Sequence, residues 1–326
     1  GTSGRAAVGL AAHLLPVADG RAMMGSLRNP AASNHLPRLR PTTGRVPGAD
    51  ENSKLFFDQL ATDGPMGRDV TDTIKLLTTM AGFDAREPLS LQETLPRAES
   101  FVPTTLEDGV RIGWMGDYGG YLATEPGLLD ICRGALQGVE TKGAVVEDCA
   151  PDFELERLWD TWLTLRHFAF IDSQPLLKDP TLKSQLKPEF QWEIEGSLGM
   201  SAAQVVTADT ARSNWYRALM ALFDEYDFLA LPTAQVFPFD AQTHWPSKIN
   251  GKPMDTYHRW MEVVIGGTLA GLPVVNLPAG FDQQGRPIGI QILGPTGRDK
   301  AVLEFALAYE AVTSYLEQRP SLVTSL

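Results

Sequence analysis

Cysteine is scarce in this chain of 326 residues, which contains only Cys132 and Cys149. Neither belongs to a C-x-x-C pair or stands near a cluster of histidines, which excludes a disulfide framework and a structural zinc site. We therefore predict two buried bystander thiols and a reducing compartment, the cytoplasm. The opening residues lack a basic region followed by a long apolar one, so they are not a signal peptide.

Long apolar runs and basic clusters are also missing. No apolar run approaches the roughly 20 residues that a bilayer-spanning helix needs. The net charge of −12 argues against a surface that tracks nucleic-acid phosphates. The sequence contains no H-E-x-x-H, P-loop or G-x-S-x-G motif, and no dinucleotide-binding G-x-G-x-x-G. We therefore expect neither a membrane nor a nucleic acid as partner.

Strand and helix patterns alternate along the chain, which predicts an α/β fold with a central mixed, mostly parallel twisted sheet covered by helices on both faces. We expect one domain over residues 1–326. Residues 17–47 are expected to be ordered loop with one short strand, and 83–108 a surface excursion. Predicted strands lie within 110–116, 143–153, 226–233, 271–280 and 285–294. Predicted helices cover 5–15, 67–82, 128–142, much of 154–221, and a segment from Asp299 onward.

Two aspartates stand where helix caps are expected. Asp69 precedes Val70, Ile74 and Leu77, which recur at helical spacing. Asp299 precedes the final amphipathic pattern in the same way. The acidic run at 224–227 is interpreted as the solvated end of a helix before a buried strand, with a carboxylate site as the alternative.

The stretch "DGRAMMGSLRNP", residues 19–30, is the most informative for chemistry. Gly25 allows a tight turn, and the N–H groups of Met23, Met24, Gly25 and Ser26 can then form a nest for a developing oxyanion. Ser26 is thus either an ordinary loop serine or a nucleophile.

A serine nucleophile needs a base, and the five histidines offer no obvious one. His13 lies in the apolar predicted helix, where a packed core residue is expected. His258 is expected on a helix surface. The residues therefore do not favour a Ser-His-Asp triad.

The spacing of two hydroxyl residues resembles that of the amidase signature family. In that family a "GGSSGG" turn and a "GGSIRxPA" loop carry two hydroxyls of a Ser–cis-Ser–Lys triad. Here "GTSG" and "GSLRNPAA" place Thr2 and Ser26 24 positions apart, as in that family. The resemblance continues over essentially the whole chain, through "RPTTGRVPG", "DGPMGRDVTDTIKLLTTMAG", "VRIGWMGDYGG", "YDFLALPT" and "GTLAGLPVVNLPAGFDQQGRPIGIQILGP".

The resemblance implies an amide hydrolase that forms an acyl-enzyme on Ser26. Thr2 would relay the proton, and the N–H groups of Met23, Met24 and Gly25 would hold the oxyanion. Ser3, the second hydroxyl of the turn, is expected beside the substrate. No metal or organic cofactor is implied. The "YHRWMEVV" stretch at 257–264 resembles bacterial amidases of small or hydrophobic, linear or cyclic amides.

Several positions depart from the family pattern. The family's lysine precedes the glycine-serine turn, whereas the first lysine here is Lys54, so we expect a chain truncated at its N-terminus and impaired in hydrolysis. Thr2 replaces a serine, Arg5 a glycine and Ala22 an aspartate. "SNHLPRLRP", residues 33–41, replaces a more apolar, glycine-bearing stretch. The alternative function is a non-catalytic amidase-like scaffold, and dimerisation through an uncovered apolar face is expected.

Overall fold

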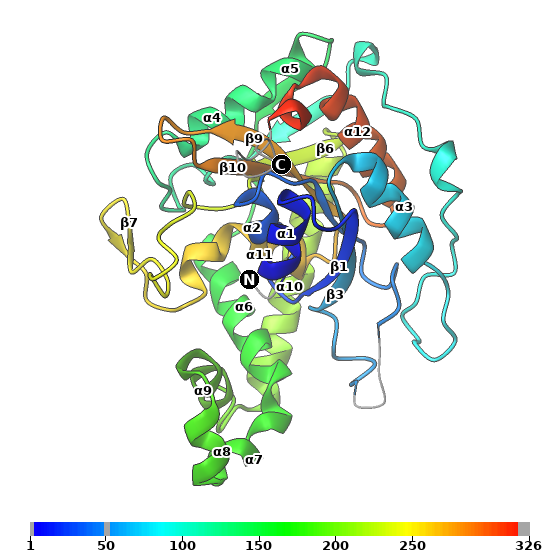
Figure 1. Ribbon diagram of the computed structural model, residues 1–326. Coiled ribbons are helices and arrows are strands. Elements are labelled where there is room, and N and C mark those ends of the chain that lie inside the picture. The colour runs from blue at the N-terminus through cyan, green and yellow to red at the C-terminus, as the bar shows by residue number, and fades with distance from the viewer. Residues whose placement is uncertain (1–2, 49–52, 319–326) are drawn as a thin grey trace. The chain divides into compact units, whose positions relative to one another are not determined.

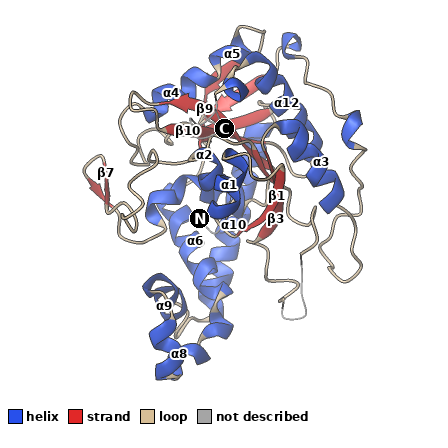
Figure 2. Cartoon of the chain, in the orientation of Figure 1, coloured by secondary structure: helices blue, strands red, loops and turns tan. Residues whose placement is uncertain are grey.

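The chain folds as an α/β protein, as the sequence predicts. The computed structural model describes residues 3–48 and 53–318, whose helices and strands are coloured in Figure 2. The chain forms two compact units, Gly1–Ala150 with Met220–Leu326 (unit 1) and Pro151–Leu219 (unit 2). The expectation of a single domain over 1–326 stays a prediction. Within the described residues, no helix is both long and apolar enough to cross a membrane.

Unit 1 is built on one eight-stranded sheet with the order β1-β3-β2-β9-β10-β6-β4-β5 (Figure 1). Its strands are β1 (Val17–Ala22), β2 (Arg38–Arg40), β3 (Thr62–Gly67), β4 (Arg111–Trp114), β5 (Val145–Asp148), β6 (Phe228–Pro232), β9 (Val274–Phe281) and β10 (Pro287–Leu293). A second small sheet pairs β7 (Lys248–Ile249) with β8 (Lys252–Pro253). The helices of this unit are α1 (Gly4–Ala11), α2 (Arg28–Ala32), α3 (Val70–Met80), α4 (Leu128–Ala135), α5 (Gln137–Glu140), α11 (Ile265–Leu269) and α12 (Asp299–Val312), with 3₁₀ turns η1 (Ala98–Ser100), η2 (Leu106–Asp108), η4 (Arg259–Val264) and η5 (Tyr315–Glu317).

Parallel and antiparallel pairs occupy different ends of this sheet. β4 pairs in parallel with both β5 and β6, so the predicted β-α-β unit is confirmed. The neighbours from β1 through β3, β2, β9 and β10 to β6 pair antiparallel. The sheet is mixed as predicted, but parallel strands predominate only at the β6-β4-β5 end. Short connections, such as residues 282–286 between β9 and β10, join antiparallel neighbours because a parallel crossover needs a longer connection.

Helices of unit 1 cover both faces of the sheet, as expected. Val275, Leu277 and Ala279 alternate along β9 and face the core beneath α4 and α12. Asn276 lies between them and therefore faces the opposite side. There α2 packs on β9 and β10, and Asn276 Nδ2 donates to the Leu36 carbonyl at 2.8 Å.

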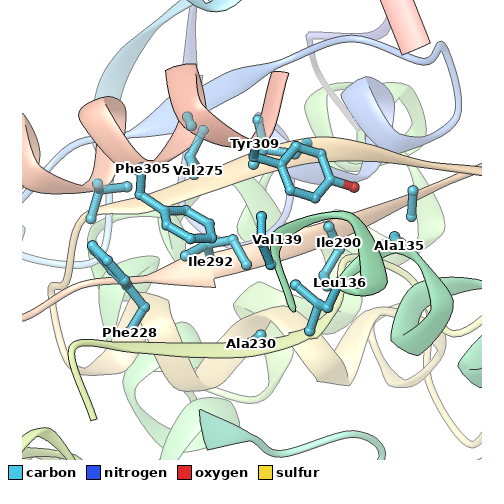
Figure 3. Packing of buried hydrophobic residues seen from close by; sticks show 14 of the residues in the cluster. Ala135, Leu136, Val139, Phe228, Ala230, Val275, Ile290, Ile292, Phe305 and Tyr309 are labelled. Carbon is cyan, nitrogen blue, oxygen red and sulfur yellow. The ribbon is translucent and has the colours of Figure 1, made fainter. Parts of the chain in front are cut away.

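The larger core of unit 1 lies under α3, α4, α5 and α12, and Figure 3 shows part of it. The rings of Phe228 on β6 and Phe305 on α12 lie with centroids 4.8 Å apart. Tyr309 is buried on the same helix and donates its hydroxyl to the Pro278 carbonyl at 2.8 Å. Each such side chain contributes about 1.5–3 kcal/mol on burial. This core therefore holds β6, β9 and β10 as a stable platform.

A smaller core lies on the other face, between α1, α2 and strands β1 and β3. Ala7 and Leu10 of α1 belong to the same buried cluster as Leu27 and Met66. α1 ends at Ala11, short of the predicted boundary, and His13 follows it with φ of 57°. His13 is therefore a half-buried turn residue and not the core residue that its apolar surroundings suggest.

The two predicted caps have different outcomes. Asp69 caps α3, because its side chain accepts the Asp72 N–H at 2.7 Å. Asp299 does not cap α12. Its buried carboxylate instead accepts from the Thr42 N–H at 2.8 Å and from Arg45 Nε at 3.1 Å. A hydrogen bond to a buried guanidinium is stronger than one to a local amide, which explains the difference.

Other boundaries also differ from expectation. Residues 17–47 hold β1, α2 and β2, although their glycines and prolines indicated mostly loop. Pro30 lies in the first turn of α2, where its missing N–H costs nothing. The helix predicted over 128–142 is interrupted at Leu136, which separates α4 from α5. Segment 83–108 is mostly irregular, as predicted.

Unit 2 is helical throughout, as predicted for this segment. Arg166 on α6 donates to Glu193 on α9 at 2.8 Å, and His167 Nδ1 lies 2.8 Å from the Glu193 carbonyl. These contacts join the two helices. The elements are α6 (Leu155–Ala169), η3 (Ile171–Ser173), α7 (Pro175–Lys178), α8 (Pro180–Gln185), α9 (Pro188–Glu195) and α10 (Ala202–Phe223), the last of which continues into unit 1.

Candidate functional site

Ser26 lies in the turn of residues 23–27, which connects the edge strand β1 to the short buried helix α2. Ser26 is half-buried, whereas Met24 and Gly25 beside it are buried. The turn follows β1 because the pairing of β1 with β3 ends at Ala22. We refer to residues 23–27 as the Ser26 turn.

The carbonyl groups of the Ser26 turn from Met24 onward accept hydrogen bonds inside the protein. Met24 O accepts from Arg28 Nη2 at 2.8 Å, and Gly25 O accepts from the Asn29 N–H at 2.8 Å. Ser26 O accepts from Arg38 Nη1 at 3.3 Å. Three successive peptide oxygens are therefore fixed.

Fixing the oxygens also fixes the N–H groups. In a trans peptide the N–H of the next residue points away from the carbonyl oxygen. The N–H groups of Gly25 and Ser26 therefore point away from Arg28 and Asn29. Among residues 3–48 and 53–318, no acceptor takes a hydrogen bond from the N–H of Met23, Met24, Gly25 or Ser26.

Gly25 is required by the space around it. A Cβ at this position would lie 1.7 Å from Asn29 Oδ1 and 3.0 Å from Val264 Cγ2. Asn29 cannot easily move, because it is buried and its Nδ2 donates to the Thr233 carbonyl at 2.9 Å. The turn therefore packs too closely for any other residue at position 25.

Arg28 joins the Ser26 turn to the segment around η4. It is fully buried and donates to Val264 O at 2.9 Å, to Thr268 Oγ1 at 2.6 Å and to Gln291 Oε1 at 2.9 Å, besides Met24 O. Burial, followed by the charge of Arg40, lowers the pKa of Arg28 well below its usual value. Gln291 completes this network by donating to backbone carbonyls at the end of β6 and in η4.

A second polar group lies on η4 and was missed by sequence reasoning. Glu262 is buried, accepts the Tyr121 hydroxyl at 2.8 Å and lies 3.3 Å from Arg259 Nη1. Burial, and next the charge of Glu262, raise the pKa of Tyr118, which therefore stays a neutral phenol. The only sequence signal was the stretch 257–264, which carried no residue assignment. His258, expected on a helix surface, is 2% exposed, because η4 packs into unit 1.

The other predicted site residues have different outcomes. Thr2 lies outside the described residues. Ser3 is buried at the start of α1, and its Oγ would lie 2.4 Å from a Cβ built on Gly20 of β1. Leu27 Cδ2 is 3.1 Å from the same point, so Ser3 adjoins the Ser26 turn.

Arg5 is exposed on α1, whereas Ala22 is buried at the end of β1. Cys132 and Cys149 are free thiols, buried and half-buried.

Comparison with known proteins gives a consistent result. The Amidase family model matches residues 1–303. An acylamidase of Rhodococcus erythropolis is 30% identical over 332 residues, covering 98% of this chain and 66% of that protein. A glutamyl-tRNA(Gln) amidotransferase subunit of Pseudomonas putida is also 30% identical, covering 98% and 69%. The chain spans about two thirds of the length of these relatives.

Solved structures agree with the sequences. A bacterial aryl acylamidase of the amidase signature family superposes with a TM-score of 0.86 at 25% identity, covering 98% of this chain and 68% of that one. The 6-aminohexanoate cyclic dimer hydrolase shares the fold with a TM-score of 0.80 at 21% identity, covering 99% and 70%. On the match over residues 1–303 and the relatives at 30% identity, the chain belongs to the amidase family.

Proposed function

We propose that the chain hydrolyses carboxylic amides through an acyl-enzyme on Ser26. The observation that supports this most directly is the Ser26 turn itself. Its carbonyls are held inward by Arg28, Asn29 and Arg38, which leaves the N–H groups beside Ser26 without acceptors among the described residues. Preorganised N–H donors of this kind are usually the largest electrostatic contribution in acyl transfer.

The chemistry follows from that arrangement. Ser26 Oγ attacks the amide carbon and forms a C–O bond, while the carbonyl electron pair moves to an oxygen held by the N–H groups of Met23, Met24 and Gly25. Collapse of this intermediate breaks the C–N bond, and the amine leaves with the proton relayed through Thr2. Ser3 supports the substrate from the adjoining start of α1. Water then hydrolyses the ester in the same way and restores Ser26.

This chemistry requires a general base that starts the proton relay. In the family resemblance a lysine before the turn starts the relay, and residues 1–326 contain no lysine before Lys54. Loss of a general base typically costs about 10²–10⁴-fold in rate. We therefore propose that residues 1–326 alone are impaired in turnover. A non-catalytic amidase-like scaffold is the alternative, and the same missing lysine favours it.

The substrate is proposed to be a small-molecule amide, linear or cyclic. The relatives supporting this are an acylamidase, an aryl acylamidase and a cyclic dimer hydrolase. The cytoplasmic location and the homodimer stay predictions, the second to be tested by light scattering.

Labelling with a fluorophosphonate, followed by peptide mass spectrometry, tests the proposal. We expect slow formation of an adduct on the peptide that carries Ser26, and its loss in Ser26→Ala. Ser33→Ala is the matched control, because Ser33 is exposed at the end of the adjoining helix and should leave labelling unchanged. A folded chain that forms no adduct would support the scaffold instead.

A further inference from the structure

β2 carries a charged residue that the proposed chemistry does not require. Arg38 belongs to the stretch 33–41, which departs from the apolar, glycine-bearing pattern of the family. Its side chain is fully buried, and its strand lies between β3 and β9 in the sheet. No carboxylate among residues 3–48 and 53–318 forms an ion pair with Arg38. A buried and unpaired guanidinium is costly, so its contacts call for an explanation.

Those contacts are directed at the Ser26 turn. Arg38 Nη1 donates to the Leu27 carbonyl at 2.5 Å and to the Ser26 carbonyl at 3.3 Å. Its Nε and Nη2 have no partner within the described part of the chain. Every hydrogen bond of this guanidinium is therefore made to the peptide groups directly after the nucleophile.

We propose that Arg38 is a positioning residue for Ser26, holding the Ser26 carbonyl inward and placing a cation beneath the turn, where it favours the deprotonated hydroxyl and the oxyanion. This inference rests on the proposed role of Ser26. It adds a residue from β2 to a site that otherwise depends on the turn, α1 and α2.

Burial strengthens such a charge effect. Water is largely excluded from a protein interior and charges there are weakly screened, so a buried cation bound to the Ser26 carbonyl acts strongly on the Ser26 hydroxyl. Burial lowers the pKa of Arg38 to about 9, which leaves the cation intact at pH 7. Charged groups on adjoining elements include Arg28 of α2, Arg40 of β2 and Asp63 of β3, whose carboxylate pairs with Arg21 at 3.3 Å. Asp72 and Lys75 of α3, which contacts β2, pair with each other at 3.7 Å.

The test compares the rate of Ser26 labelling by a fluorophosphonate between pH 6 and 10 in three variants. Arg38→Met and Arg38→Gln remove the charge at every pH. Arg40→Met is the matched control: Arg40 is equally buried on the same strand, but its guanidinium donates to the Leu272 and Leu60 carbonyls.

Loss of the charge should move the pH midpoint of labelling up by about one unit and lower the rate at pH 7 about tenfold. Arg40→Met should not move the midpoint. A purely structural role would lower the rate at every pH without moving the midpoint, which would overturn the inference. Arg38→Gln provides the neutral comparison if Arg38→Met does not fold.

The two proposals fail in different ways. If Ser26 of the native chain is not labelled at any pH, the hydrolase proposal fails and the role of Arg38 fails with it. If Ser26 is labelled equally in the native chain and in both neutral variants, only the role of Arg38 is overturned. An equal shift in Arg40→Met would also overturn it, because the effect would then belong to any cation of β2.

Discussion

Arg45 and Asp299 form an ion pair from which solvent is excluded. Arg45 Nε lies 3.1 Å from Asp299 Oδ2, and the two side chains are 1% and 0% exposed. Asp299 also accepts the Thr42 N–H at 2.8 Å. The pair joins the first turn of α12 to the loop after β2. It therefore links two segments that are distant in sequence and that both belong to unit 1, which contains the Ser26 turn.

Asp299→Ala is expected to destabilise the protein by about 1–3 kcal/mol, because it leaves Arg45 Nε and the Thr42 N–H without their buried acceptor, whereas Glu93 still pairs with Arg45 Nη2 at 2.9 Å. Urea denaturation at pH 7 measures the loss. The control is Glu147→Ala, which breaks the pair of Arg111 and Glu147, side chains that are 48% and 46% exposed. That loss should be at most about 1 kcal/mol. Equal losses in the two variants would contradict the argument.

Gly25→Ala is expected to abolish Ser26 labelling, because its Cβ would overlap Asn29 Oδ1. Adding Asn29→Ala should restore part of the labelling by removing the overlapping atoms. Gly4→Ala is the control, since no atom lies within 4 Å of a Cβ at Gly4. Labelling at the native rate in Gly25→Ala would show that the turn is less tightly packed than the structure indicates.

Much of the fold was predictable because its signals are local. The nearly continuous apolar sequences of β6 and β9 indicate strands that are buried on both faces. The helical spacing of Val70, Ile74 and Leu77 after Asp69 indicates α3 and its cap. The position of the Ser26 turn was also predictable, through a motif that combines a glycine with a hydroxyl residue. β1 and β2 were harder to place, because Gly20 within the edge strand β1 and the prolines Pro37 and Pro41 on either side of β2 resemble loop.

The support of the site was not predictable, because its partners are far apart in sequence. Arg28 meets Gln291 across 263 positions, and Tyr121 meets Glu262 across 141. A single sequence gives no indication of such pairs. Buried charge misleads in the same way: Arg38 in a polar stretch indicates exposure, and only the tertiary structure encloses it.

Glu310 should make stability fall as pH rises. Burial raises its pKa from 4.5 to about 7, and the charges of Asp69 and Asp72 add to the effect. Between pH 4.5 and 7 the folded chain keeps a proton that the unfolded chain has lost, so the free energy of unfolding decreases through that window. Glu310→Gln should remove this contribution to the slope and still accept the Val70 N–H. Urea denaturation between pH 5 and 8 measures it, and an unchanged slope would refute the assignment.

The titration of His35 should change the free energy of unfolding with pH in the opposite direction. Burial lowers its pKa from 6.5 to about 4, its ring lies 4.4 Å from that of Phe281, and its Nδ1 is buried without a partner. As pH falls from 6.5 to 4, the unfolded chain takes up a proton that the folded imidazole resists, so stability decreases toward acid. His35→Asn tolerates the φ of 56° at this position and cannot titrate. It should be less stable at pH 7, because the ring contact is lost, but should lose less stability between pH 6.5 and 4.

The opposing slopes of His35 and Glu310 partly cancel in the native chain. Each single variant should therefore be steeper in one direction than the native chain, and thermal melts of the double variant at the same pH values should be flattest. A double variant as steep as His35→Asn would assign the remaining slope to other groups.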